Sequence, residues 1–337
     1  MHRISLAVVG LGNAFVPHAK SLQDLADRVS VHWAASPSPE RTRTVAEQFG
    51  FPVTNDVDQA IMDPAVEAVL LLTPPSTHPD LTRRCLESGK HVLLEKPLAC
   101  SLEDAESIVA DAKRFDRRLG VVLQHRFRPG SMRLHDLVRA GALGKIQAAS
   151  MSVPWWRAQG YYDEPGRGTI ARDGGGVLIT QAIHTLDLFR SLVGISEVVA
   201  AQAITTNLHR MECEDYATAL VRLGAGGPGT IVATTAAYPG RPERIDIIGS
   251  LGTASLVGGA LQVCFLDGTV EQVLSEERTG GGADPMDFPH GAHRAVLSDF
   301  LDAIESGREP SVSGSEALAT QRVIAEILER SHGQLAR

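Results

Sequence analysis

The feature that most constrains this chain is the alternation of short apolar runs with amphipathic stretches over its first third. The apolar runs are rich in valine and leucine and are bounded by glycine or polar residues, as buried parallel strands are. We expect strands at residues 4–9, 31–35, 68–72, 91–94 and 119–123. We expect helices between them at residues 39–49, 76–88 and 102–115. This alternation predicts a doubly wound parallel sheet with helices on both faces.

The pattern changes after about residue 124. A strong amphipathic helix is expected at residues 176–192, and from residue 198 to 274 strands follow one another across glycine-rich turns, which predicts an antiparallel sheet. The glycine-rich run at residues 279–285 is expected to be a surface loop. A chain of 337 residues exceeds one ordinary core. We therefore predict an α/β protein with a doubly wound domain at residues 1–124 and an α+β domain on a mostly antiparallel open sheet at residues 125–337.

Composition excludes several classes of function. The net charge of −8, without a long basic cluster, argues against nucleic acid as a partner and favours a small molecule. No segment reaches the roughly 20 apolar residues that span a bilayer, so no membrane contact is expected. The four cysteines lie far apart and lack zinc-ligand spacing, so we expect no metal site and a reducing, cytoplasmic setting.

A glycine turn follows the first expected strand and opens a helix. Its sequence is Gly10-Leu11-Gly12-Asn13-Ala14-Phe15. In this context backbone N–H groups and a helix N-terminus bind the pyrophosphate of a dinucleotide. Phe15 stands where the third glycine of the fingerprint would be, so the motif is incomplete.

The end of the second expected strand bears on the choice of dinucleotide. NAD sites usually place an acidic residue there for the ribose hydroxyls, but this chain has Ser36, with Ser38 and Arg41 following. A small hydroxyl with a nearby arginine suits a 2′-phosphate, which favours NADP(H) over NAD(H). The alternative is that the serines only cap the next helix and the arginine is solvated.

Three further stretches carry a family resemblance. The first is Thr73-Pro74-Pro75-Ser76-Thr77-His78, and the second runs from Gly89-Lys90-His91-Val92 to Glu95-Lys96-Pro97. The third is Asp173-Gly174-Gly175-Gly176 with His184 and Asp187 downstream. Together with the glycine turn, they closely resemble the Gfo/Idh/MocA family, the glucose–fructose oxidoreductase and inositol dehydrogenase group.

The resemblance implies an NAD(P)-dependent oxidoreductase. Such an enzyme moves a hydride between the nicotinamide and a hydroxyl-bearing carbon of a sugar, sugar acid or cyclic polyol. It also implies an N-terminal Rossmann domain and a C-terminal domain whose open sheet often builds dimers or tetramers, so a homodimer or homotetramer is expected. The residues expected to bind the cofactor are Gly10, Gly12, Asn13, Ala14, Phe15, Ser36, Arg41, Thr73, Pro74, Pro75, His78, Glu95, Lys96 and Gln124.

The expected catalytic residues are Lys96, His184 and Thr180. Lys96 ends a parallel strand, and the resemblance gives it a peptide bond to Pro97 that is commonly cis and places it beside both nicotinamide and substrate. Its ammonium can stabilise charge on the reacting oxygen. His184 can accept the hydroxyl proton, and Asp187 could hold its ring or a backbone group. Helical spacing puts Thr180, His184 and Asp187 on one face. Thr180 replaces the aspartate of inositol dehydrogenase-like members, which argues against inositol itself as the substrate.

An unusually aromatic and basic segment precedes the triple glycine. Aromatic rings stack on sugar faces and arginines bind carboxylates or phosphates. We expect substrate contacts from Lys96, Arg126, Trp156, Arg157, Tyr162, Arg167, Thr180 and His184. A packing or oligomer-contact loop is the equal alternative for residues 155–167.

Three other functions are compatible with the resemblance. Some relatives are glycoside hydrolases that act through transient oxidation by bound NAD, and others oxidise dihydrodiols. A non-catalytic dinucleotide-sensing regulator would not need the lysine and the histidine, both of which are present.

Overall fold

The computed structural model describes residues 3–275 and 289–335, with side chains up to residue 331, and divides into two compact units. The first unit comprises Met1–Gln124 and Pro289–Leu318, and the second comprises His125–Phe288 and Ala319–Arg337. The expected second domain, residues 125–337, needs correction, because residues 289–318 belong with the first unit. The expected loop at residues 279–285 lies outside the described residues.

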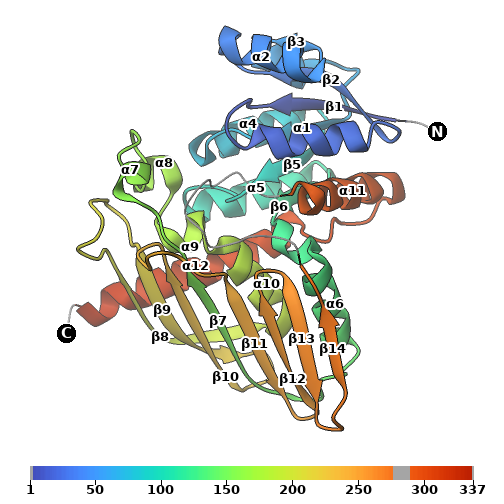
Figure 1. Ribbon diagram of the computed structural model, residues 1–337. Helices are drawn as coiled ribbons and strands as arrows, with labels where there is room; N and C mark the ends of the chain where they lie inside the picture. The colour runs from blue at the N-terminus through green and yellow to red at the C-terminus, as the bar shows by residue number, and fades with distance from the viewer. Residues whose placement is uncertain (1–2, 276–288, 336–337) are drawn as a thin grey trace. The chain divides into compact units, whose positions relative to one another are not determined.

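The first unit contains a six-stranded parallel sheet in the order β3-β2-β1-β4-β5-β6 (Figure 1). Its strands are β1 (Ile4–Val9), β2 (Val29–Ala35), β3 (Val53–Thr54), β4 (Ala68–Leu71), β5 (His91–Glu95) and β6 (Leu119–Val122). The central strands β1 and β4 are almost wholly buried, which explains why their sequences are continuous apolar runs. The predicted doubly wound sheet is confirmed.

Helices flank this sheet. They are α1 (Phe15–Asp24), α2 (Pro39–Phe49), α3 (Val57–Met62), α4 (His78–Glu87), α5 (Leu102–Arg114) and α11 (Gly291–Ser306), with a short 3₁₀ turn η1 (Pro75–Thr77) before α4. The late helix α11 packs on α1. Asp24 at the end of α1 lies 2.8 Å from His290 Nε2 and 3.2 Å from Arg294 Nη1. These contacts are the reason that a C-terminal helix belongs to the N-terminal unit.

The register of the parallel strands collects the predicted cofactor residues at one edge. Val9 pairs with Ala35 on one side and with Leu71 on the other, and Leu71 pairs with Leu94. The residues that follow these strands therefore meet at the carboxyl edge, where doubly wound sheets bind ligands.

The second unit contains an eight-stranded sheet in the order β14-β13-β12-β11-β7-β10-β9-β8, antiparallel except for the pairing of β7 with β10. Its strands are β7 (Ile146–Pro154), β8 (Ile195–Ile204), β9 (Tyr216–Leu223), β10 (Pro228–Thr234), β11 (Arg244–Gly249), β12 (Gly252–Val257), β13 (Ala260–Phe265) and β14 (Val270–Val273). Buried and more exposed side chains alternate along β9 and β11, as in a sheet covered on one face. The predicted mostly antiparallel sheet is confirmed.

The helices of the second unit pack on this sheet and on one another. They are η2 (Gln124–Phe127), α6 (Pro129–Arg139), α7 (Gln159–Tyr162), α8 (Ile170–Asp173), α9 (Val177–Thr180), α10 (Ile183–Val193) and the greater part of α12 (Gly314–Leu335). Helix α12 runs along the edge strand β8, whose Val198 and Ala203 N–H groups donate to Glu326 and Ser331. Across residues 3–275 and 289–335, no helix has the length and apolar character to cross a membrane.

Candidate active site

The glycine turn of the first unit is shaped by close backbone approach. Gly10 has a φ of 102°, and a Cβ there would lie 2.7 Å from the carbonyl carbon of Leu72. Position 10 therefore requires glycine. A Cβ on Gly12 would meet only the Arg41 side chain, at 3.8 Å. The N-cap of α1, Ala14, provides no side-chain hydrogen bond, so first-turn N–H groups of this helix can receive an anion.

Phe15 is a packing residue, and its predicted cofactor contact stays a prediction. Its side chain is buried and packs edge-on against Phe49, with ring centroids 5.5 Å apart. It fills the space between α1 and α2, and the hydrophobic effect keeps it there. Asn13 is exposed beside it.

Ser36, Ser38 and Arg41, which follow β2, differ in burial and in hydrogen bonding. Ser36 is buried, and its hydroxyl accepts the N–H of Ser38. Ser38 is the N-cap of α2 and accepts the N–H of Arg41, so its capping role is real. The Arg41 side chain is exposed and reaches toward Gly12. An anionic group beside the glycine turn would therefore meet Arg41 more directly than Ser36.

His78 contacts backbone carbonyl oxygens that follow two neighbouring strands. Its Nδ1 lies 2.9 Å from the Pro97 carbonyl oxygen and 3.2 Å from that of Leu98, and its Nε2 lies 2.9 Å from the Thr73 carbonyl oxygen. The side chain is fully buried, and its predicted cofactor contact stays a prediction. Burial lowers the pKa of His78, although the three carbonyl contacts and Glu95 act in the opposite direction. A neutral imidazole carries one N–H group, so His78 donates either from Nδ1 or from Nε2, but not from both.

Lys96 follows β5 at the ligand edge and is partly exposed. Its bond to Pro97 is cis, as the resemblance implies. The Lys96 backbone N–H donates to Glu95 Oε2 at 3.0 Å, and Glu95 Oε1 lies 3.0 Å from His18 Nε2. Both Glu95 oxygens thus have hydrogen-bond partners within the protein, and its contact with the cofactor stays a prediction.

His18, Glu95 and His293 are a group, among the residues described, that could hold a metal ion. Their potential ligand atoms lie within 4.8 Å of one another. The His18 and His293 rings meet edge to face at 5.1 Å. Burial opposes ionisation of Glu95, but the hydrogen bond from His18 and the charges of His18, Lys96 and His293 lower its pKa. The contacts on the Glu95 carboxylate make the cluster a hydrogen-bonded support beneath the turn at Lys96.

Gln124 and Arg126 lie on the 3₁₀ turn η2, where the two units meet in sequence. The Gln124 side-chain oxygen is buried and accepts no hydrogen bond from the described residues. Arg126 instead forms a two-pronged ion pair with Asp187, at 2.6 and 2.7 Å. This pair uses two of the guanidinium nitrogens, and the substrate contact of Arg126 stays a prediction.

The expected helix at residues 176–192 is broken into α9 and α10 at Gln181 and Ala182. Thr180 therefore belongs to a different helix from His184 and Asp187, and the predicted shared face needs correction. The Thr180 hydroxyl donates to the carbonyl of Gly176 at 2.5 Å and also contacts the Gln181 side chain.

Asp187 does not hold the His184 ring. Besides Arg126, its fully buried carboxylate accepts the hydroxyl of Thr320 at 2.7 Å. His184 is 8% exposed, and its ring lies 5.1 Å from that of His125 at an angle of 32°. His125 is thus the neighbour that the sequence pattern did not reveal, because helical spacing says nothing about a residue 59 positions earlier.

Glu214 is a residue that sequence reasoning missed. Its buried carboxylate accepts the N–H groups of Gly176 and Leu178 at 3.1 Å, so it caps the start of α9. Burial raises the pKa of Glu214 despite these hydrogen bonds. A Cβ on Gly176 would lie 1.9 Å from the Glu214 carbonyl oxygen, which explains why glycine precedes α9. No sequence signal connects Glu214, which precedes β9, with the triple glycine.

The aromatic and basic segment, residues 155–167, contains both packing residues and partly exposed residues. Tyr162 is buried, and its hydroxyl lies 2.6 Å from that of Thr235, so it is a core residue. Trp156 packs between Tyr238 and His209, with ring centroids 5.5 and 5.7 Å away. Neither placement supports the predicted substrate contact.

The two arginines of this segment are partly exposed and flank Tyr161. The guanidinium carbon of Arg167 lies 4.6 Å from the Tyr161 ring centroid, and that of Arg157 lies 5.7 Å from it. Arg167 also pairs with Glu164 at 2.7 Å. Hydrogen bonds with Arg167 and Arg172 and the charges of both arginines lower the pKa of Glu164 to about 2, against a smaller opposing effect of burial.

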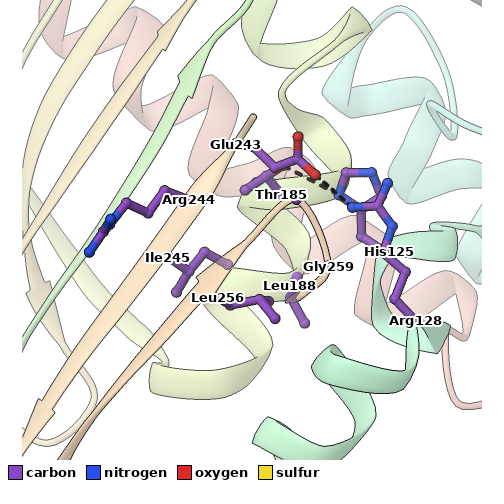
Figure 2. A pocket seen from close by; sticks show the side chains of 10 residues that line it. His125, Arg128, Thr185, Leu188, Glu243, Arg244, Ile245, Leu256 and Gly259 are labelled. Carbon is purple, nitrogen blue, oxygen red and sulfur yellow. Dashed lines mark hydrogen bonds and ion pairs between the residues drawn. The ribbon is translucent and has the colours of Figure 1, made fainter. Parts of the chain in front are cut away.

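Figure 2 shows a small pocket of the second unit, beside the ion pair between Arg128 and Glu243 at 2.6 Å. The loop at Gly259 and the side chains of His125 and Thr185 also line it. None of the predicted site residues lines this pocket, so we do not assign the substrate to it.

The fold and the residues at its ligand edge define a dinucleotide-binding protein of two units. The first unit matches the model of an oxidoreductase family with an NAD-binding Rossmann fold over residues 4–123, and the second matches the Gfo/Idh/MocA C-terminal domain over residues 131–255. The chain therefore belongs to the Gfo/Idh/MocA family of oxidoreductases, as the sequence resemblance predicted.

Relatives of this chain include named dehydrogenases. It is 27% identical to myo-inositol 2-dehydrogenase of Thermotoga maritima, over 92% of this chain and 91% of the relative. It is 28% identical to the NAD(+)-dependent scyllo-inositol 2-dehydrogenase of Bacillus subtilis, over 94% and 90%. Its structure is similar to that of the WlbA dehydrogenase of Bordetella pertussis in complex with NADH and UDP-GlcNAcA, with a TM-score of 0.83, 26% identity and coverage of 98% and 97%.

Proposed function

We propose that this protein is a dehydrogenase that transfers a hydride between a nicotinamide dinucleotide and a hydroxyl-bearing carbon of a sugar, sugar acid or cyclic polyol. The observation that carries the proposal is the position of Lys96, directly after β5 at the edge where the glycine turn of Gly10 also lies. The relatives that act on inositols, and the one bound to NADH and a sugar nucleotide, support the same class of reaction.

The residues present fit a dinucleotide. Gly10 and Gly12 leave the backbone open to the pyrophosphate, and the start of α1 offers N–H groups without a side-chain cap. Thr73, Pro74 and Pro75 follow β4 at the same edge. The buried side-chain oxygen of Gln124 is an acceptor that a bound ligand could satisfy. The nicotinamide, when bound, accepts or supplies the hydride.

The chain's own residues would manage the proton and the developing charge. The Lys96 ammonium donates a hydrogen bond to the reacting oxygen and stabilises negative charge on it. His184 accepts the hydroxyl proton as the carbonyl forms and returns it in the reverse direction. Thr180 orients groups by hydrogen bonding and cannot act as a carboxylate base. These roles follow the family resemblance.

We further propose that NADP(H) is preferred over NAD(H). The support is that Ser36, not an acidic residue, directly follows β2, and that Arg41 is exposed beside Gly12. A guanidinium there would attract a 2′-phosphate.

We also propose a homodimer or homotetramer built on the outer face of the second unit's sheet. Val199, Leu220 and Ile248 are large apolar side chains of this sheet that are 39%, 43% and 48% exposed. Sedimentation at micromolar concentration tests this proposal, and a monomer alone would oppose it. A cytoplasmic location is proposed because the four cysteines are free thiols.

Turnover by a lysine variant tests the central proposal. A panel of sugars, uronates and cyclic polyols would be offered with NAD+ and NADP+, and reduction of the cofactor would be followed by absorbance. Lys96→Met should lower turnover by about 10²-fold or more, because a charged donor to the oxyanion is lost. The variant should still fold and bind cofactor. If Lys96→Met turned over at the wild-type rate, the proposal would be refuted.

A further inference from the structure

We propose that Arg157 binds a carboxylate group of the substrate, so that sugar acids are preferred over neutral sugars and polyols. This inference rests on the proposed dehydrogenase function and narrows its substrate class.

The charge of Arg157 has no counter-charge among the residues that the structure describes. Its guanidinium makes one side-chain hydrogen bond, from Nη1 to the Trp156 carbonyl at 2.9 Å, and its buried Nε lacks an acceptor. Arg167 is the other arginine of this segment that is expected to bind the substrate, and its charge is already neutralised by Glu164. A partly buried cation without a carboxylate is costly, and a ligand carboxylate would offset that cost.

Aromatic rings shape the surroundings of this guanidinium. Its central carbon lies 5.5 Å from the Trp155 ring centroid and 5.7 Å from that of Tyr161. The Trp155 indole N–H is a second buried donor without an acceptor in the described chain. Burial lowers the pKa of Arg157, and the two nearby tyrosines are the groups that oppose this. Unused donors beside an uncompensated cation favour a ligand that brings acceptor oxygens.

The Arg157 backbone is fixed before any ligand arrives. Its N–H donates to the Thr235 carbonyl at 2.9 Å, and its own carbonyl lies 2.8 Å from His209 Nε2. His209 is in turn held by the buried carboxylate of Asp215, at 2.7 Å from Nδ1. A guanidinium on a fixed backbone loses less entropy on binding than a free surface arginine does.

The same cluster adjoins the junction that carries two predicted catalytic residues. The Tyr161 hydroxyl accepts a hydrogen bond from Gln181 Nε2 at 3.3 Å. Gln181 separates α9, which ends at Thr180, from α10, which begins one residue before His184. A small substrate could therefore be held by its acid group at Arg157 while its hydroxyl is presented toward this junction.

A carboxylate fits better than a phosphate. One planar guanidinium matches one planar carboxylate, whereas a phosphate carries more charge and usually recruits several donors. The experiment therefore compares four pairs of sugar acid and neutral sugar, including D-glucuronate with D-glucose, and adds D-glucose 6-phosphate. Two quantities are measured: kcat/KM with the preferred cofactor, and direct calorimetric binding to the NADH- or NADPH-saturated protein.

The wild type should favour at least one acid over its neutral partner in both measurements. Arg157→Gln should remove this preference, lowering kcat/KM for the acid by about 10- to 100-fold with little change for the neutral sugar. Arg157→Lys should give an intermediate loss, because it keeps the charge without the fork. The control is Arg210→Gln, since Arg210 has an exposed side chain near the same segment.

Different outcomes separate the two proposals. If no acid is favoured in either measurement, or if Arg157→Gln changes thermal stability but not the acid-to-neutral ratio, the carboxylate proposal is overturned. Preference for the sugar phosphate would also overturn it. Calorimetry keeps the test independent of turnover, so an Arg157-dependent preference for acids without any cofactor reduction would count against the dehydrogenase function alone.

Discussion

The imidazole of His78 links the carbonyl oxygen of Thr73, 2.9 Å from Nε2, to that of Pro97, 2.9 Å from Nδ1. One buried side chain thus ties the end of β4 to the turn that carries Lys96. The carboxylate of Glu95 secures the other side of Lys96 by accepting its N–H. The lysine is therefore placed by side chains from helices as well as by its own strand.

Removal of this link should impair turnover more than cofactor binding. His78→Ala is expected to lower kcat by about 10- to 100-fold, because small displacements of a reacting group are costly. The dissociation constant of the cofactor should change only a few-fold. His78→Asn should restore part of kcat, since its amide N–H group can donate to one of these carbonyl oxygens. Equal losses in kcat and cofactor affinity, without rescue by asparagine, would argue against a positioning role.

The pH–rate profile should identify the proton acceptor. His184→Ala is expected to lower turnover by roughly 10²- to 10⁴-fold and to remove one ionisation from the profile. Thr180→Val should cost less, because it removes only a hydroxyl that donates to Gly176. A fully active His184→Ala enzyme would transfer the base role to Lys96 or to the segment 155–167.

The preference for NADP(H) over NAD(H) should change when the charge of the residues that follow β2 is changed. Arg41→Ala is expected to weaken NADP(H) binding, while Arg43→Ala, on another side of α2, should not. Ser36→Asp should shift preference toward NAD(H), because a carboxylate repels a 2′-phosphate and accepts from ribose hydroxyls. Fluorescence titration with both cofactors measures this. Tighter binding of NAD(H) by the unmodified protein would refute the NADP proposal.

Gly176 should not tolerate even one added methyl group. Gly176→Ala would place a Cβ 1.9 Å from the Glu214 carbonyl oxygen, and we expect a loss of about 2 kcal/mol or more in the free energy of unfolding. Gly160→Ala is the matched control, because a Cβ at Gly160 in α7 meets nothing within 4 Å. Urea unfolding compares the two variants. Equal stability would show that the start of α9 can adjust.

His91 should make the first unit sensitive to acid. Its Nδ1 accepts the N–H of Arg118 at 2.9 Å, and burial, with the charges of Arg117 and Arg118, lowers its pKa from 6.5 to about 4. Since the unfolded chain binds the proton first, stability present above pH 6.5 is lost as the pH falls toward 4. The loss attributable to His91 is roughly 3 kcal/mol at most.

The variant His91→Asn isolates this effect. Its amide oxygen can accept the same N–H but does not titrate in this range. Melting temperatures of both proteins would be compared from pH 7 to pH 4. The wild type should lose stability relative to the variant across that interval, and parallel curves would contradict the assignment.

The sequence alone determined the two sheets and the ligand edge. Continuous apolar runs can be satisfied only by strands buried on both faces, and the residues after those strands, Gly10 and Lys96 among them, must then share one edge. The family resemblance followed from contiguous motifs of that edge and from the triple-glycine motif of the second unit. Local patterns were sufficient because each of these features is encoded within a few neighbouring residues.

Only the tertiary structure decided which side chains are free to act. Phe15, Tyr162 and His78 are predicted site residues, and the structure buries each against residues 19 to 73 positions away. Arg126 and Asp187 neutralise one another, and Glu214 caps the start of α9 beside Gly176, a contact that helical periodicity does not reveal. Partners so distant in sequence leave no periodic signal, because their pairing depends on how the strands and helices pack.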